Sequence, residues 1–244
     1  MVLCAMRLSL HRLTMLMCIV LCSASLNACR SGDGLPDPSS QTYREAVAAF
    51  YTGLAALQAG VEVIAEEQML HVTTLVPQEP AAWANLGLLA LRRTAFDLAA
   101  ERLHKARTLA PGSSQIQVLS GLLENMQGRL DMARAYLQRA VALEPRNLKA
   151  LYALVQLIEQ QGGEHSAAEV QRLLMQLRQL QSDNLVVLLE LARVAAKRGD
   201  MQTLQDSITH LAGKATAWPP VAQEQLRSVQ TVAAEAMQIA RRNT

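Results

Sequence analysis

Three prolines in this chain are equally spaced. The interval from Pro77 to Pro111 equals that from Pro111 to Pro145 (111 − 77 = 145 − 111), and three glycines, at 53, 87 and 121, keep the same spacing. A fixed period of about 34 residues is typical of arrays in which one helical hairpin is repeated along the chain. Such arrays bury each hairpin against the next, and they hold partners far more often than they perform chemistry.

The other positions that recur in register are small or apolar. Trp83, Gly87 and Ala90 are separated by three or four positions, so they share one face of the first helix of their hairpin. Gly87 and Ala99 are expected to face each other where the two helices of a hairpin cross, because larger side chains would hold the backbones apart. The structural repeat positions are Gly53, Gly87, Gly121, Trp83, Ala99, Ala133, Pro77, Pro111 and Pro145.

The turns inside the hairpins are marked by glycine. Gly60, Gly128 and Gly162 stand between the two helices of their units, where a positive φ angle is cheap only for glycine. Thr94 takes this place in the second unit, so we expect that turn to be the most strained. Gly199 follows Gly162 by three residues more than the regular period of about 34, and these three residues are expected to lengthen the helix that contains Leu173.

These patterns predict an all-α fold of paired helices. Half of the residues are hydrophobic but only 3% are aromatic, as expected when alanine and leucine fill helix interfaces. The predicted helices span residues 43–58 and 61–75, 80–93 and 95–109, 114–127 and 130–143, 148–161 and 164–181, and 184–198 and 201–213. A last helix, preceded by Trp218-Pro219-Pro220, carries one apolar stripe and is expected to cap the open end of the array.

The repeated residues are similar to a known repeat. Trp83, Leu86 and Gly87, followed by Ala99, Leu103, Ala106 and finally Pro111, resemble the tetratricopeptide repeat (TPR), although Ala90 stands where that family usually has tyrosine. The resemblance implies a right-handed superhelical array of antiparallel helix pairs, with four to five repeats over residues 43–217 and a capping helix at 218–244.

The N-terminus carries a pattern of export. After Arg7, His11 and Arg12, the stretch from Leu13 to Cys29 contains no charge, and its length is short for a spanning helix and typical of an export signal. No cysteine follows Cys29, so the mature chain is expected to have no disulfide. An uncleaved hydrophobic anchor, or a secretory signal with a chance cysteine, are the alternatives.

The end of that signal resembles a bacterial lipobox. Leu26-Asn27-Ala28-Cys29 is similar to the motif L-x-[AG]-C, in which lipid is attached to the cysteine before cleavage. This resemblance implies a signal peptide at residues 1–28, lipidation of Cys29 and a flexible tether at 29–42. It also implies an exported protein that is lipid-anchored in the bacterial cell envelope, at the outer membrane and facing the periplasm, because Arg30 rather than Asp follows the cysteine.

Charge and composition argue against several classes of function. Arg7 and Arg12 leave with the signal, so 23 basic and 21 acidic residues become 21 and 21, and a neutral domain argues against nucleic acid as a partner. No histidine pair has metal-ligand spacing, and no phosphate-binding glycine loop is present. We therefore expect no enzyme, catalytic residue, cofactor or metal.

The predicted partner-binding groove follows from helix geometry. Positions 5, 9 and 12 of each first helix share a face, and in TPR arrays this face lines a concave groove. The groove is expected to be apolar at its N-terminal end, which favours a protein or peptide partner with an apolar segment. The alternative is that its leucines only pack against adjacent helices. The groove residues are Phe50, Leu54, Leu57, Ala84, Leu88, Leu91, Val118, Leu122, Asn125, Tyr152, Gln156 and Glu159.

Together these features predict a non-catalytic, membrane-tethered scaffold or adaptor that binds a protein or peptide in the cell envelope. The run from Phe50 to Leu57 and that from Pro80 to Leu91 are similar to N-terminal repeat segments of bacterial FG-GAP/ASPIC-type propeller proteins. No strand-rich region follows here, so we expect any propeller to be a separate chain or to have been lost. The size and lipobox also resemble pilotin lipoproteins, which help the secretin of the type IV pilus reach the outer membrane. An accessory subunit of an envelope enzyme is a further alternative.

Overall fold

The computed structural model describes residues 36–163 and 165–215, together with eleven residues between 220 and 238. The predicted signal peptide, Cys29 and the first part of the predicted tether lie outside the described residues. The described residues form helices and turns, which confirms the all-α helical-repeat array. They divide into two compact units, and the chain passes from the first to the second between Leu86 and Gly87.

The first unit contains one complete helical hairpin and the start of another. Helix α2 (Gln41–Gln58) packs against α3 (Glu62–Leu75), and the first half of α4 (Pro80–Arg92) follows. The hydroxyl of Ser40 caps α2 by accepting a hydrogen bond from the backbone N–H of Tyr43 at 3.0 Å. The core of this unit is built from Ala49, Met69, Val72, Ala82 and Leu86, with Phe50, Leu54 and Trp83 packed at its edge.

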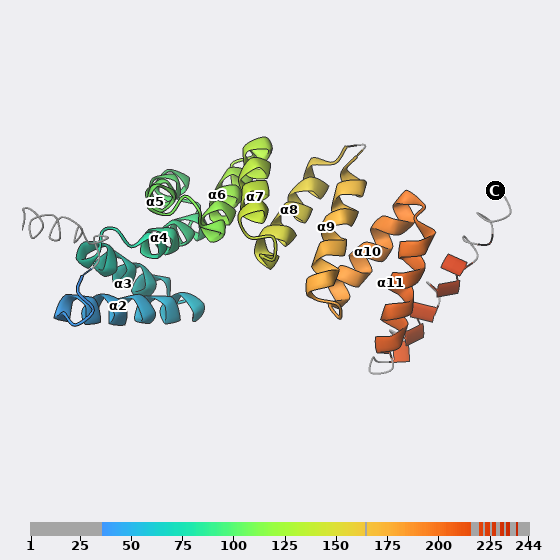
Figure 1. The fold of residues 1–244 in the computed structure, drawn as a ribbon, viewed down its shortest axis with the longest axis horizontal. Helices are drawn as coiled ribbons and strands as arrows, with labels where there is room; N and C mark the ends of the chain where they lie inside the picture. The colour runs from blue at the N-terminus through green and yellow to red at the C-terminus, as the bar shows by residue number, and fades with distance from the viewer. Residues whose placement is uncertain are drawn as a thin grey trace, which may run out of the picture. The chain divides into compact units, whose positions relative to one another are not determined.

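The second unit contains the end of α4 and the helices that follow it in pairs. Its elements are α5 (Phe96–Leu109), α6 (Ser114–Met126), α7 (Leu130–Leu143), α8 (Leu148–Gln161), α9 (Ser166–Leu180), α10 (Leu185–Arg198) and α11 (Met201–Lys214). From α6 to α11, each helix packs against the helix before it, and Figure 1 shows this succession. The boundaries of these helices lie within two residues of the predicted ones.

Small residues let the helices of each hairpin approach closely. A Cβ atom built on Gly87 would lie 2.7 Å from the side chain of Leu103, and one on Gly121 would lie 2.8 Å from that of Leu137. The side chain nearest to each glycine is therefore a leucine of the second helix. The Cβ on Gly121 would also lie 3.2 Å from the carbonyl oxygen of Ala133, which is the repeat equivalent of the fully buried Ala99.

The turns of the hairpins confirm the predicted backbone conformations. Gly60, Gly128 and Gly162 have φ angles of 76°, 75° and 68°. Thr94 has a φ of 55°, and among the described residues it is the one non-glycine residue with a positive φ. A β-branched residue in this region is strained, because its Cβ approaches the neighbouring carbonyl. Each repeat proline lies two residues beyond the end of a second helix, at 75, 109 and 143.

The extra length between Gly162 and Gly199 is distributed differently from the prediction. Helix α9 has 15 residues, one more than the 14 of α7. Helix α9 begins four residues after Gly162, whereas α7 begins two residues after Gly128. Two of the three additional residues therefore lie before the helix and only one lengthens it, so the expectation that the helix absorbs all three was wrong.

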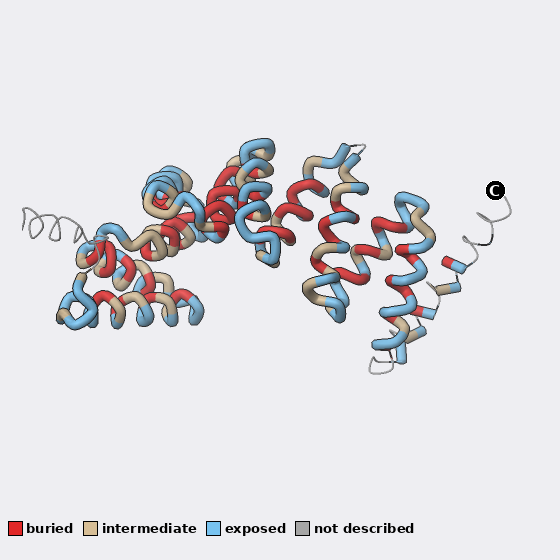
Figure 2. The backbone as a smooth tube through the Cα atoms, in the orientation of Figure 1, coloured by how far each residue is buried: buried red, intermediate tan, exposed pale blue. Residues whose placement is uncertain are grey.

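Hydrogen bonds between polar side chains fix each hairpin on the next within the second unit. The amide of Asn147, the N-cap of α8, donates to Ser114 Oγ at 2.8 Å, and Ser114 donates to the carbonyl of Ala140 at 3.0 Å. Asn184, the N-cap of α10, repeats this role by donating to the hydroxyl of Tyr152 at 2.9 Å. Figure 2 shows that buried residues recur along the helices of this unit.

The described residues between 220 and 238 are helical and pack on the last hairpin. Leu226 is buried against Leu188, Leu211 and Ala215. Ala233 is buried in a second cluster with Ala195, Leu204 and Ile208. These contacts cover apolar surface of α10 and α11 that the last repeat of an array would otherwise expose to water.

Candidate partner-binding surface

The predicted groove residues of the first unit are less accessible than their pattern suggested. Leu57 and Ala84 are buried, and Phe50 and Leu54 are half-buried because they pack against the core of that unit around Met69. The side chain with most exposed surface near them is Tyr51, whose ring meets that of Phe50 edge to face at a centroid distance of 5.9 Å. At this end Leu57 and Ala84 are therefore engaged in packing, whereas Phe50 also lines a pocket of about 280 Å³ together with Val47 and Tyr51.

In the second unit the predicted residues separate into buried and accessible ones. Leu91 is only 2% exposed, and Val118 is buried because it joins the core cluster formed by α7, α8, α9 and α10. Leu122, in contrast, is 39% exposed, so it offers apolar surface to a partner. Leu88 and Asn125 are half-buried. The Oδ1 atom of Asn125 is buried and has no hydrogen-bond donor among the described residues.

Helix α8 contributes three predicted residues of different character. Gln156 and Glu159 are exposed, and Tyr152 is half-buried against the core of the unit. The Tyr152 hydroxyl donates to Gln181 Oε1 at 3.2 Å and accepts from Asn184, and burial raises the pKa of this hydroxyl. Because the hydroxyl is already bonded, Tyr152 can offer a partner its ring but little hydrogen-bonding capacity.

Helix α10 continues the same surface, although its residues are absent from the predicted groove. Val186, Leu189 and Arg193 follow Lys149, Tyr152 and Gln156 at one constant interval (186 − 149 = 189 − 152 = 193 − 156), so they occupy the equivalent positions of the next repeat. Val186 is 61% exposed and Leu189 is 52% exposed. The signal was present in the sequence, but the longer step after the fourth repeat hid the register beyond it.

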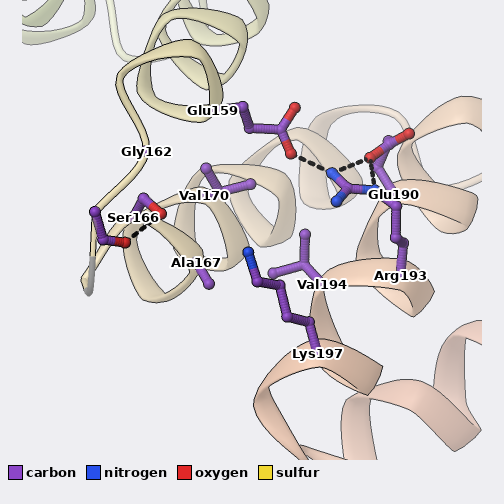
Figure 3. Close-up of a pocket in the computed structure, with 10 residues that line it drawn as sticks. Glu159, Gly162, Ser166, Ala167, Val170, Glu190, Arg193, Val194 and Lys197 are labelled. Carbon is purple, nitrogen blue, oxygen red and sulfur yellow. Dashed lines mark hydrogen bonds and ion pairs between the residues drawn. The ribbon is translucent and has the colours of Figure 1, made fainter.

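A pocket of about 470 Å³ lies between α8, α9 and α10 and borders this surface (Figure 3). Its wall is made by the C-terminal end of α8, the first turn of α9 and the second half of α10. Its apolar side is small, consisting of Ala167, Val170 and Val194. Its charged side chains are Glu159, Glu190, Arg193 and Lys197.

Three of those four charged groups are paired with one another. The Arg193 guanidinium donates from Nε to Glu190 Oε2 at 2.7 Å and also forms an ion pair with Glu159. Both carboxylates raise the pKa of Arg193, the hydrogen bond that Arg193 donates to Glu190 having the larger effect. Since Glu159 belongs to α8 and Arg193 to α10, the ion pair between them links the first helix of one repeat to the first helix of the next. Figure 3 shows Lys197 extending beside Val194, with its ammonium group turned toward α9.

No group of three or more histidine, cysteine, aspartate or glutamate side chains could hold a metal ion within residues 36–163 and 165–215. None of the described helices is both long and apolar enough to cross a bilayer. The surface combines exposed aliphatic groups, one half-buried ring and a charged pocket on helices that pack against one another.

Comparison with solved structures identifies the class of fold. PilF of Pseudomonas aeruginosa matches with a TM-score of 0.64 at 19% identity, covering 83% of this chain and 93% of PilF. Yeast Tom70 matches with a TM-score of 0.58 at 17% identity, covering 80% of this chain and 40% of Tom70. MamA of Desulfovibrio magneticus RS-1 matches with a TM-score of 0.56 at 14% identity, covering 72% of this chain and 98% of MamA.

These proteins are TPR proteins, so the chain has a TPR-type fold. At sequence identities this low, the likeness concerns the fold alone. No protein-family model and no curated protein sequence matches the chain.

Proposed function

We propose that this protein is a non-catalytic TPR scaffold that binds a protein or peptide partner. The partner binds the first-helix surface of the second unit, which we define as the faces of α6, α8 and α10 that carry Leu122, Tyr152 and Leu189. The observation that supports this most is that apolar side chains stay accessible on this surface in separate repeats, Leu122 on α6 and Leu189 with Val186 on α10. Exposed aliphatic groups of this size cost solubility and are typical of interaction sites when they recur on one surface. The helices that present them are fixed by buried side chains and inter-repeat hydrogen bonds, which keeps the surface preorganised.

The proposal includes a location. The lipobox-like sequence ending in Cys29 supports lipidation and a membrane tether in the bacterial cell envelope. The tether is rich in Gly, Pro, Ser and Asp before the N-cap of α2 at Ser40, and such a composition lets a domain stand away from its anchor. Mass spectrometry of the mature N-terminus tests this part: a diacylated or triacylated cysteine is expected, and an unmodified Cys29 contradicts it.

A pilotin-like assembly factor for a type IV pilus secretin is the more specific alternative. Its support is architectural, because an export signal with a lipobox precedes a helical-repeat array of this size. An accessory subunit of an envelope enzyme, or of a separate propeller protein, would use the same surface. Copurification after mild detergent extraction separates these alternatives, since a secretin, an enzyme or a propeller protein would be recovered with the chain.

Binding itself is tested with one variant on the proposed surface and one control variant on a second helix. Leu122→Glu places a charge on the first-helix surface, and Met132→Glu places the same charge on α7, a second helix, where the methionine is 49% exposed. We expect Leu122→Glu to lose the partners that the wild-type chain retains, and Met132→Glu to keep them. Circular dichroism establishes that both variants remain helical. Equal retention by both variants contradicts the proposed surface.

A further inference from the structure

We infer that the surface of α10 is the docking site for a peptide segment that carries an apolar side chain and, about 12 Å further along, an acidic one. This inference rests on the proposed function and names the chemistry of its partner. Four side chains of α10 define the site: Val186, Leu189, Arg193 and Lys197. They follow one another at intervals of three, four and four positions, so they form one stripe along the helix.

The apolar half of the stripe is the most exposed apolar surface that the described first helices of the second unit offer. Val186 and Leu189 are more than half exposed, whereas Leu91 and Val118, at groove positions of earlier repeats, are buried. The ring of Tyr152 occupies on α8 the repeat position that Leu189 has on α10. A branched or aromatic side chain of the partner would therefore gain most by docking here.

The charged half of the stripe selects the sign of the partner's charge. Arg193 is held by Glu190 on its own helix and by Glu159 on α8. Lys197 lines the same pocket, and among the described residues its ammonium group has no ion-pair partner. It stands beside apolar side chains of α9 and α10, where a carboxylate brought in by a partner would be partly removed from water. An acidic side chain is thus the complement that the pocket lacks.

Helix geometry fixes the separation of the two groups. Leu189 and Lys197 are eight positions apart, which corresponds to about 12 Å at the rise of an α-helix. An extended peptide covers this distance in about four residues, and residues four apart in an extended chain point to the same side. The structure thus assigns a motif in which an acidic residue follows or precedes an apolar anchor by about four positions.

A library of random dodecapeptides displayed on phage tests the motif directly. The full chain, purified in mild detergent, is panned beside Leu189→Asp and Lys197→Glu. The matched controls are Met132→Asp and Lys105→Glu, which place the same charges on the second helices α7 and α5. Leu189, Lys197, Met132 and Lys105 are all exposed, so the helices should tolerate each substitution, and circular dichroism verifies this.

The expected result is enrichment of peptides with an apolar and an acidic residue about four positions apart. Lys197→Glu should shift the preference to lysine or arginine at the acidic position and weaken the best wild-type peptide about tenfold. Leu189→Asp should abolish enrichment, and both controls should retain it. An enriched set without charge preference, or one that Lys197→Glu leaves unchanged, overturns the inference.

The outcomes also separate this inference from the proposed function. Peptides whose binding is lost in Leu122→Glu but not in Leu189→Asp would keep the scaffold function and overturn the assignment to α10. Failure of the wild-type chain to enrich any peptide would overturn both. Enrichment of basic peptides by the wild-type chain would assign the Glu159 and Glu190 carboxylates as the ligands, and that result also contradicts the inference.

Discussion

Replacing Gly121 with alanine should destabilise the hairpin formed by α6 and α7. The new Cβ would lie 2.8 Å from Leu137 Cγ and 3.2 Å from the carbonyl oxygen of Ala133. Leu137 is buried, so its side chain has little room to rotate away, and the carbonyl belongs to the backbone of α7, so it can move only if the helix shifts. Overpacking of this kind costs about 1–3 kcal/mol.

The helix propensity of alanine offsets part of this cost. Glycine within a helix is about 1 kcal/mol less favourable than alanine, so the net loss in the free energy of unfolding should be about 0–2 kcal/mol for Gly121→Ala. Gly121→Val adds two further methyl groups and recovers less propensity, so its loss should be about 2–3 kcal/mol. The order of stability expected is glycine, then alanine, then valine.

Gly213 provides the matched control. It lies near the end of α11, and a Cβ built on it would meet no atom within 4 Å. Gly213→Ala should therefore gain propensity without a clash and stabilise the chain by up to about 1 kcal/mol. Urea unfolding followed by circular dichroism compares the two alanine variants. If Gly121→Ala raises the midpoint as much as Gly213→Ala does, the close approach of α6 and α7 is not what determines the residue at 121.

Three other predictions concern turns and caps. Thr94→Gly should stabilise the chain by about 1 kcal/mol, because glycine adopts the φ of 55° without strain, and an unchanged urea midpoint would contradict this. Asn184→Ala should destabilise the chain by about 1–2 kcal/mol, because the Asn184 side chain accepts hydrogen bonds from the N–H groups of Val186 and Val187 and donates one to the Tyr152 hydroxyl. The control is Ser182→Ala at an exposed position, which should leave stability unchanged. Hydrogen bonds from the N–H and hydroxyl of Thr203 lower the pKa of Asp200 below its ordinary value of 3.8. The ionised carboxylate therefore stabilises the fold above pH 3.8, and this stabilisation is lost as the pH falls through the lowered pKa. Asp200→Asn should consequently lower the urea midpoint at neutral pH and flatten its dependence on acid; an equally steep acid dependence in the variant would refute this.

Much of the fold could be predicted because one period repeats in the sequence. The spacing of Pro77, Pro111 and Pro145 locates the helix ends, and Gly128 and Thr94 mark turns with positive φ. These are local signals, and each depends on a residue whose backbone conformation is restricted or unusually free. The identity of the side chain that fills the space at Gly87 is not a local property, and the sequence pattern does not single out Leu103, which the structure places there.

The candidate surface could be predicted only in part. Periodicity tells which face of a helix a side chain shares, but it does not tell how deeply neighbouring helices cover that face. The pattern assigns Leu91 and Leu122 to the same groove, yet one is buried and the other is exposed. Leu189 is absent from the predicted groove because the fifth repeat begins three residues later than the regular period, although the distance from Gly162 to Gly199 already records this shift in the sequence.

Photocrosslinking in cells tests the central claim most directly, namely that this chain acts by holding a partner on the first-helix surface of its second unit. A photoreactive phenylalanine is introduced in place of Leu122 on α6 or in place of Met132 on α7, two sites of similar exposure in adjacent helices. The account predicts a discrete protein adduct from the site on α6 and none from the site on α7. Adducts of equal intensity from both sites, or an adduct from α7 alone, would contradict it.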